Sequence, residues 1–144
     1  MMYPEPMVAP MREELTRLGM RELRTAADVA EALGNAKGTA LVFVNSVCGC
    51  SARNARPAVA AALRHTVTPD EVFTVFAGQD VDATKAARAF FTGYPPSSPS
   101  IALLKDGRIV GMLERHQIEG RMVAEVVQDL VSAFDRHCVT GAAL

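Results

Sequence analysis

Two cysteines separated by one glycine carry the chemistry that this sequence offers most plainly. Cys48, Gly49 and Cys50 follow an apolar run that ends at Asn45, and the Ala-, Arg- and Leu-rich residues 52–65 after them predict a helix. The start of a helix presents unpaired N–H groups and the positive end of the helix dipole, and both stabilise a thiolate. Because the thiolate is the nucleophilic form, this placement indicates reactive cysteines. We expect the thiol pKa of Cys48 to lie below its ordinary value of about 8.5.

The composition is typical of a folded globular protein and argues against several broad classes. The chain has 144 residues, of which 49% are hydrophobic and 22% charged, with a net charge of -1. That charge gives no electrostatic case for a nucleic-acid or anionic membrane partner. No apolar run approaches the roughly 20 residues of a membrane span, and residues 1–10 lack the pattern of a secretory signal. We therefore expect one domain over residues 1–144, located in the cytoplasm, where close-spaced cysteines are more often catalytic or metal-binding than structural.

The segments that must position the cysteines alternate between helices and strands. Three prolines predict an irregular lead-in over residues 1–10, and Thr25 with Asp28 predicts a capped helix start. Pro57 should kink the helix that follows the cysteines. In chain order we expect a helix at 11–18, an extended segment at 20–24, a helix at 26–33, a strand at 39–45, a helix at 52–65, a strand at 71–77 and a helix at 81–91. Strand–helix–strand order implies right-handed parallel crossovers.

The second half of the chain predicts a hairpin and a long terminal helix. The turn-rich residues 94–99 precede two strands, 100–104 and 108–113, which a tight turn at 105–107 should join as an antiparallel hairpin. Apolar residues at three- and four-residue spacings predict a helix at 118–136 that packs one broad face on a sheet. The whole pattern indicates the α/β class, with a central mixed sheet that has helices on both faces.

This order of elements resembles the thioredoxin fold. In that fold a strand delivers a cysteine pair to a kinked helix, and a proline precedes a hairpin and a last helix. Residues 98–108, Ser-Pro-Ser-Ile-Ala-Leu-Leu-Lys-Asp-Gly-Arg, look like the fold's cis-proline, strand and Lys-(Asn/Asp)-Gly turn. The resemblance implies a cis Ser98–Pro99 bond beside the nucleophile, with the Ser98 backbone open to an extended substrate. Residues 1–18 would then be an N-terminal helical extension.

Two departures from thioredoxin itself point to a narrower family. One residue, in place of two, separates the cysteines, and the chain has no tryptophan. The segments 44–50 (Val-Asn-Ser-Val-Cys-Gly-Cys), 56–57 (Arg-Pro), 97–100 (Ser-Ser-Pro-Ser) and 115–120 (Arg-His-Gln-Ile-Glu-Gly) together resemble the bacilliredoxins.

That family resemblance implies a thiol–disulfide oxidoreductase that removes bacillithiol, a low-molecular-weight thiol, from mixed disulfides on client proteins. Cys48 would attack, and either Cys50 or free bacillithiol would resolve the adduct. Bacillithiol would act as co-substrate, and no metal or organic cofactor is expected. The resemblance leaves open whether the protein is a monomer or a homodimer.

The polar residues near the cysteines have both a functional and an ordinary explanation. Gly49 would permit the backbone turn that brings the two cysteines together. Arg53 could stabilise a thiolate or attract an anionic small thiol, and an ordinary solvated charge explains it equally well. For Arg56 we expect a solvated helix charge, and for Asn45 and Ser46 a role in capping or turn formation. The candidate site therefore comprises Cys48 and Cys50 as catalytic residues, with Gly49, Arg53, Ser98 and Pro99 as substrate contacts.

Three other functions stay open at this stage. The protein could be a disulfide isomerase that acts without a small thiol, or a metal carrier that uses the cysteine pair as soft ligands for Cu(I) or zinc. It could also be a redox-inert scaffold, which the intact cysteine pair disfavours. A zinc site normally takes four ligands, and the remaining candidates are Cys138 and three scattered histidines. We therefore expect no metal site and interpret Cys138 as a free surface or packing cysteine.

Overall fold

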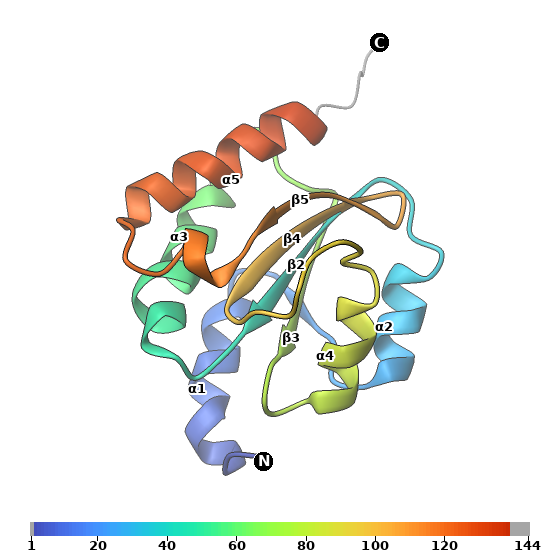
Figure 1. Cartoon of the computed structure of the whole chain (residues 1–144), viewed down its shortest axis with the longest axis vertical. Coiled ribbons are helices and arrows are strands. Elements are labelled where there is room, and N and C mark those ends of the chain that lie inside the picture. The colour runs from blue at the N-terminus through green and yellow to red at the C-terminus, as the bar shows by residue number, and fades with distance from the viewer. Residues whose placement is uncertain (1, 139–144) are drawn as a thin grey trace.

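A five-stranded mixed sheet forms the centre of the protein in the computed structural model, which describes residues 2–138 (Figure 1). The elements in chain order are α1 (Glu5–Thr16), β1 (Arg21–Glu22), α2 (Ala26–Leu33), β2 (Thr39–Asn45), a π-helical turn η1 (Ser51–Ala55), α3 (Arg56–Ala62), β3 (Glu71–Phe76), α4 (Val81–Arg88), β4 (Ser100–Lys105), β5 (Arg108–Leu113), a 3-10 turn η2 (Arg115–Gln117) and α5 (Val123–His137). The strands lie in the order β1-β3-β2-β4-β5. The predicted α/β class is confirmed.

The pairing of the strands follows the predicted connections. β2 runs parallel to β3, and β3 runs parallel to β1, so the predicted parallel pairing of these strands is confirmed. β4 lies antiparallel to β2 and to β5. Asp106 and Gly107 both have positive φ, 51° and 79°, which suits the tight two-residue turn of the β4–β5 hairpin.

Strand β2 is buried along its whole length because helices cover both faces of the sheet (Figure 1). Successive side chains of a strand point to opposite faces. Leu41 and Phe43 accordingly pack with α3 and α5, whereas Val42 and Val44 pack with α2 and α4. This double burial explains the unbroken apolar run in the sequence, and it makes β2 a rigid support for the residues at its carboxyl end.

The predicted irregular lead-in over residues 1–10 is wrong, because α1 already begins at Glu5. Pro6 lies in the first turn of the helix, where a missing N–H removes no helical hydrogen bond. Pro10 lies inside the helix. The buried side chains of Val8, Arg12 and Leu15 recur at four- and three-residue spacings, so one face of α1 is held by packing despite this proline.

Other helix boundaries also differ from the prediction: the helix expected at 81–91 ends at Arg88, and the one expected at 52–65 ends at Ala62. The last helix begins at Val123 and not at residue 118, because Gly120 takes a left-handed conformation (φ 76°) and the Glu125 carboxylate accepts the Met122 N–H at 3.0 Å. Before α3, the Arg56 N–H donates to the Ser51 carbonyl five residues back, which makes the π-helical turn. The irregularity predicted at Pro57 therefore lies in the turn just before it.

Among residues 2–138, no helix has both the length and the apolar character needed to cross a bilayer.

Candidate active site

Asn45, at the carboxyl end of β2, holds together the segments that form the site. Its Oδ1 accepts hydrogen bonds from the Ser46 N–H at 2.9 Å, from the Ser51 hydroxyl at 3.0 Å and from Arg56 Nη1 at 2.9 Å. Its Nδ2 donates to the Met11 carbonyl at 3.1 Å. One buried amide thus links the strand end, the helix after the cysteines and α1. The expected role of Asn45 in the turn is correct but incomplete.

Arg56 is buried and hydrogen-bonds to the residues on either side of the cysteines. The prediction that it is a solvated charge is therefore wrong. Its side chain is 3% exposed, and Nη1 also donates to the Ser46 carbonyl and to the Ser51 hydroxyl, each at 3.2 Å. Its Nε lies 3.2 Å from a Glu14 carboxylate oxygen, although the direction does not suit a hydrogen bond. A buried cation requires such partners, since its transfer from water is unfavourable. The available signal was the Arg-Pro segment, which is one of those that resemble the bacilliredoxins.

The two cysteines differ in exposure although their sulfur atoms are in contact. Cys48 is partly exposed, Cys50 is 8% exposed, and their sulfurs lie 2.7 Å apart as free thiols. The Cys48 N–H donates to Ser46 Oγ at 3.2 Å, and the Ser51 N–H donates to the Cys48 carbonyl at 3.0 Å. These bonds place Cys48 at the opening of the loop, and Cys50 behind it at the start of the helical segment.

The surroundings of the pair favour a thiolate on Cys48. A hydrogen bond from the Cys50 thiol is the largest effect that lowers the pKa of Cys48, and it outweighs the opposing effect of burial. The backbone N–H groups of Cys50 and Ser51 and the positive charge of Arg115 lower that pKa further. Burial and the neighbouring Cys48 sulfur raise the pKa of Cys50. The predicted direction for Cys48 is confirmed, and of the two thiols Cys48 is the one that ionises more readily.

The prediction that the loop needs the backbone freedom of Gly49 is wrong. It lies in the first turn of the helical segment without a positive φ, so the turn does not require glycine's backbone freedom. A methyl group at this position would lie 2.6 Å from Arg53 Nη2, a contact that the flexible end of the Arg53 side chain could relieve by moving. Arg53 is exposed. The arginine that lowers the pKa of Cys48 is Arg115, to which the sequence pattern assigned no role, although it begins the segment 115–120.

The segment before β4 lies beside the nucleophile, as expected. The Ser98–Pro99 peptide bond is cis, and Pro99 is buried. Ser98 and Cys48 line the same cavity, together with Arg115. The structure therefore brings together Cys48, Cys50, Gly49 and Ser98, and it adds Arg115 to them.

The remaining cysteine is part of the hydrophobic core. Cys138 is 7% exposed, packs with α3 and α5, and has a pKa raised by burial, which agrees with the packing alternative. Between residues 2 and 138, no group of three or more His, Cys, Asp or Glu side chains is arranged to hold a metal ion.

The fold and the site define a class, the thiol–disulfide oxidoreductases of thioredoxin fold. Among solved structures, a thioredoxin of Fasciola hepatica matches with a TM-score of 0.55 and 22% identity, covering 82% of this chain and 99% of that chain. A thioredoxin of Malassezia sympodialis matches with a TM-score of 0.57 and 13% identity, covering 83% and 91%. At these identities the likeness shows the fold.

Sequence relatives identify the family more narrowly. A family model described as "Disulphide isomerase" matches residues 3–138. A bacilliredoxin of Koribacter versatilis is 52% identical, covering 95% of this chain and 94% of its own. A bacilliredoxin of Symbiobacterium thermophilum is 60% identical, covering 85% of this chain and 87% of its own. A bacilliredoxin of Staphylococcus aureus is 50% identical, covering 95% of this chain and 94% of its own. The chain belongs to the bacilliredoxin family and is an enzyme of thiol–disulfide exchange.

Proposed function

We propose that this enzyme removes bacillithiol from mixed disulfides on client proteins, with Cys48 as attacking thiol and Cys50 as resolving thiol. The observation that carries the proposal is the asymmetry of the pair. The exposed sulfur has the lowered pKa, and the buried sulfur in contact with it has the raised pKa. Thiolate attack on a disulfide needs an accessible, ionised sulfur, and resolution needs a second thiol within reach.

The first step transfers the small thiol to the enzyme. The Cys48 thiolate attacks the bacillithiol sulfur of the mixed disulfide, and the bond between that sulfur and the client sulfur breaks. The client leaves as a thiolate, which takes a proton from water, and Cys48 now carries bacillithiol in a disulfide. Ser98 lines the cavity beside Cys48, and the Arg53 guanidinium lies next to Gly49. These three residues and Pro99 are the proposed substrate contacts.

The second step releases the small thiol. Cys50 loses its proton and attacks the Cys48 sulfur, so that bacillithiol leaves as a thiolate and a Cys48–Cys50 disulfide forms. Two electrons from an external thiol or dithiol then restore the reduced pair. Alternatively, free bacillithiol attacks the bacillithiol sulfur on Cys48 and leaves as its own disulfide. Neither route uses a resident metal or organic cofactor.

Single-cysteine variants test the assignment. The Cys50→Ser protein, incubated with a bacillithiolated client, should strip the thiol and retain it on Cys48 as an adduct visible by intact mass and peptide mapping. The Cys48→Ser protein should do neither, since the sulfur at Cys50 is buried. An unmodified Cys48 in the Cys50→Ser protein would end this proposal.

A disulfide isomerase without small-thiol specificity is the second candidate, favoured by the description of the matching family model. Such an enzyme would refold a scrambled disulfide protein and would gain little adduct from small-thiol substrates. A metal carrier would lose its metal with either cysteine substitution, without the asymmetry. Refolding of a scrambled protein, adduct formation and anaerobic titration with Cu(I) or zinc separate the three.

A further inference from the structure

The charged side chains that line a cavity beside Cys48 are arginines. It has a volume of about 340 Å³ and lies between the Cys48 loop, the connection from β3 to α4 and the segment before Pro99. Of the residues that the structure describes, Arg88 and Arg115 line it, and no carboxylate does. The volume is at the lower end of the range for small-molecule sites, which suits a compact ligand.

Arg88 extends from the end of α4 toward this cavity without an anionic partner. Its Nη2 donates to the Ser97 carbonyl at 3.1 Å. Within residues 2–138, no carboxylate oxygen lies within 4.0 Å of its guanidinium nitrogens, and its partial burial lowers its pKa without an opposing effect from an anion. A partly buried cation without an anion is unfavourable, so an anionic ligand would supply what the protein does not.

Arg115 approaches the same cavity from the start of η2. Its Nη1 lies 3.5 Å from the Ser98 carbonyl, and its Nη2 pairs at 3.4 Å with Glu119, whose side chain is 57% exposed. Its positive charge acts on both Cys48 and Cys50. Two cations thus border the space that a substrate must enter to reach the Cys48 sulfur, and the exposed Glu119 is a weak competitor for one of them.

We propose that Arg88 and Arg115 bind carboxylate groups of the small thiol while its sulfur faces Cys48, so that the enzyme takes anionic small thiols in preference to neutral ones. This inference rests on the proposed transfer of a small thiol to Cys48 and assigns its specificity. Arg88 is the binding residue that tests it most directly, because Arg115 also influences the ionisation of Cys48. The anion is assigned to the small thiol and not to an acidic client, since Arg88 and Cys48 line one cavity of small-molecule size.

The test measures a preference, and it needs no knowledge of the natural client. A single-cysteine peptide with uncharged neighbours is prepared as the mixed disulfide with mercaptosuccinate, which carries two carboxylates, or with neutral 2-mercaptoethanol. The rate at which each small thiol appears on Cys48 is followed by intact mass in the Cys50→Ser background. The ratio of the two rates, compared between variants, removes the intrinsic reactivity of each disulfide.

Replacement of one charge should change this ratio. Arg88→Gln should lower the mercaptosuccinate preference about tenfold, as expected for one charge-assisted hydrogen bond. Arg88→Lys, which keeps the charge, should restore part of it. Arg108→Gln is the matched control and should keep the full preference, because Arg108 is exposed at the hairpin end of the sheet, away from Cys48. In the Cys50→Ser protein that keeps Arg88, added salt should reduce the preference for mercaptosuccinate. This measurement tests the proposed role of the charge even if Arg88→Gln folds poorly.

Three results would overturn the inference. One is a ratio that neither Arg88→Gln nor salt changes. Another is a dependence on Arg88 that appears only when aspartates flank the peptide cysteine, which would assign the anion to the client. The third is the absence of any adduct on Cys48 from either substrate, which would also overturn the proposed function. Adducts formed with an unaltered ratio would overturn the specificity alone.

Discussion

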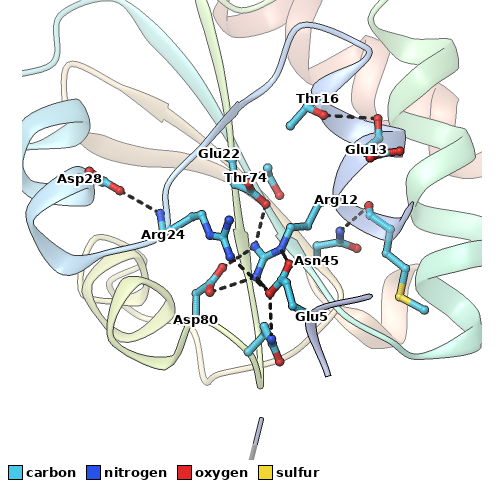
Figure 2. Close-up of polar contacts among 12 residues, drawn as sticks. Glu5, Arg12, Glu13, Thr16, Glu22, Arg24, Asp28, Asn45, Thr74 and Asp80 are labelled. Carbon is cyan, nitrogen blue, oxygen red and sulfur yellow. Dashed lines mark hydrogen bonds and ion pairs between the residues drawn. The ribbon is translucent and has the colours of Figure 1, made fainter. Parts of the chain in front are cut away.

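Two arginine environments in this protein show how the same side chain serves different purposes. Arg12 of α1 is 6% exposed and lies among three carboxylates, those of Glu5, Glu22 and Asp80, at 2.6–2.8 Å (Figure 2). Its guanidinium also lies over the Phe76 ring, 5.2 Å from the ring centroid. The protein itself supplies all the negative charge that Arg12 requires, so this cluster fastens α1 to β1 and to the start of α4.

The cavity beside Cys48 presents the opposite arrangement. Arg88 has a backbone carbonyl as its partner, and Arg115 has a carbonyl and an exposed glutamate. Arg56 lies between the two cases, because it is buried and its Nη1 is hydrogen-bonded, but these partners are Asn45 at the end of β2 and Ser46 at the start of the cysteine loop. The comparison indicates that arginines neutralised by the protein hold the fold, whereas arginines left with spare charge near the nucleophile serve a ligand.

The largest expected effect is on stability and comes from the neutralised cluster. Arg12→Met should lower the free energy of unfolding by about 3 kcal/mol, because three carboxylates lose their shared cation and two of them are largely buried. The pKa of Cys48 should stay as it is. Denaturant unfolding measures the first quantity, and thiolate absorbance against pH measures the second.

An exposed ion pair provides the control for this experiment. Arg17→Gln removes a pair with Glu13 in which both side chains are more than half exposed, and its effect should stay below about 0.5 kcal/mol. If the Arg12→Met protein loses less than about 1 kcal/mol, the cluster is not the fastening that we infer.

The second largest effect is expected from Arg56, whose replacement should lower both the stability of the protein and the rate of thiol transfer. Arg56→Met leaves the Ser46 carbonyl and the Asn45 amide oxygen with fewer donors in a buried position, which should cost about 2 kcal/mol of stability. Because the same bonds hold the cysteine loop, thiol transfer to Cys48 should also slow under conditions in which the variant is fully folded. If the Arg56→Met protein keeps the full transfer rate, Arg56 stabilises the fold, as Arg12 does, and has no part in the reaction.

The third effect concerns the source of the low Cys48 pKa. Cys50→Ala removes the thiol that donates to the Cys48 sulfur, and it should raise the pKa of Cys48. Cys50→Ser keeps a hydroxyl donor at the same position and should raise it less. Thiolate absorbance followed with pH in both variants gives the order. Equal values would mean that the hydrogen bond is not the main cause.

The smallest effect is expected from the exposed cation. Arg115→Gln should raise the pKa of Cys48, but by less than Cys50→Ala does, because the charge of Arg115 is a secondary cause and acts through solvent. A raised pKa leaves less thiolate at acidic pH and makes no difference once both proteins are ionised. With the neutral 2-mercaptoethanol disulfide as substrate, which has no carboxylate for Arg115 to bind, thiol transfer should therefore slow about two- to threefold at acidic pH and low salt, and the difference should vanish at alkaline pH. A deficit that persists at alkaline pH with this neutral substrate would show that Arg115 does not act on it through the ionisation of Cys48.

Local patterns in the sequence were sufficient for the elements that carry the site. The apolar run before Asn45, the Cys-Gly-Cys segment and the proline before the hairpin each depend on neighbours in the chain, and each lies where it was predicted. The helix boundaries were less accurate. The prolines of residues 1–10 suggested an irregular lead-in, but α1 tolerates them. Packing against distant segments buries Val8, Arg12 and Leu15, and this burial stabilises the helix.

Only the tertiary structure decided which charges are neutralised. Arg56 and Arg53 follow the same cysteines three residues apart, yet one is buried against Asn45 and the other is exposed. Arg115 and Arg88, from elements far along the chain, line one cavity with Cys48. The reason is physical: secondary structure follows from short-range periodicity, whereas the state of a charge depends on burial and on partners that meet only when the sheet and its helices have assembled.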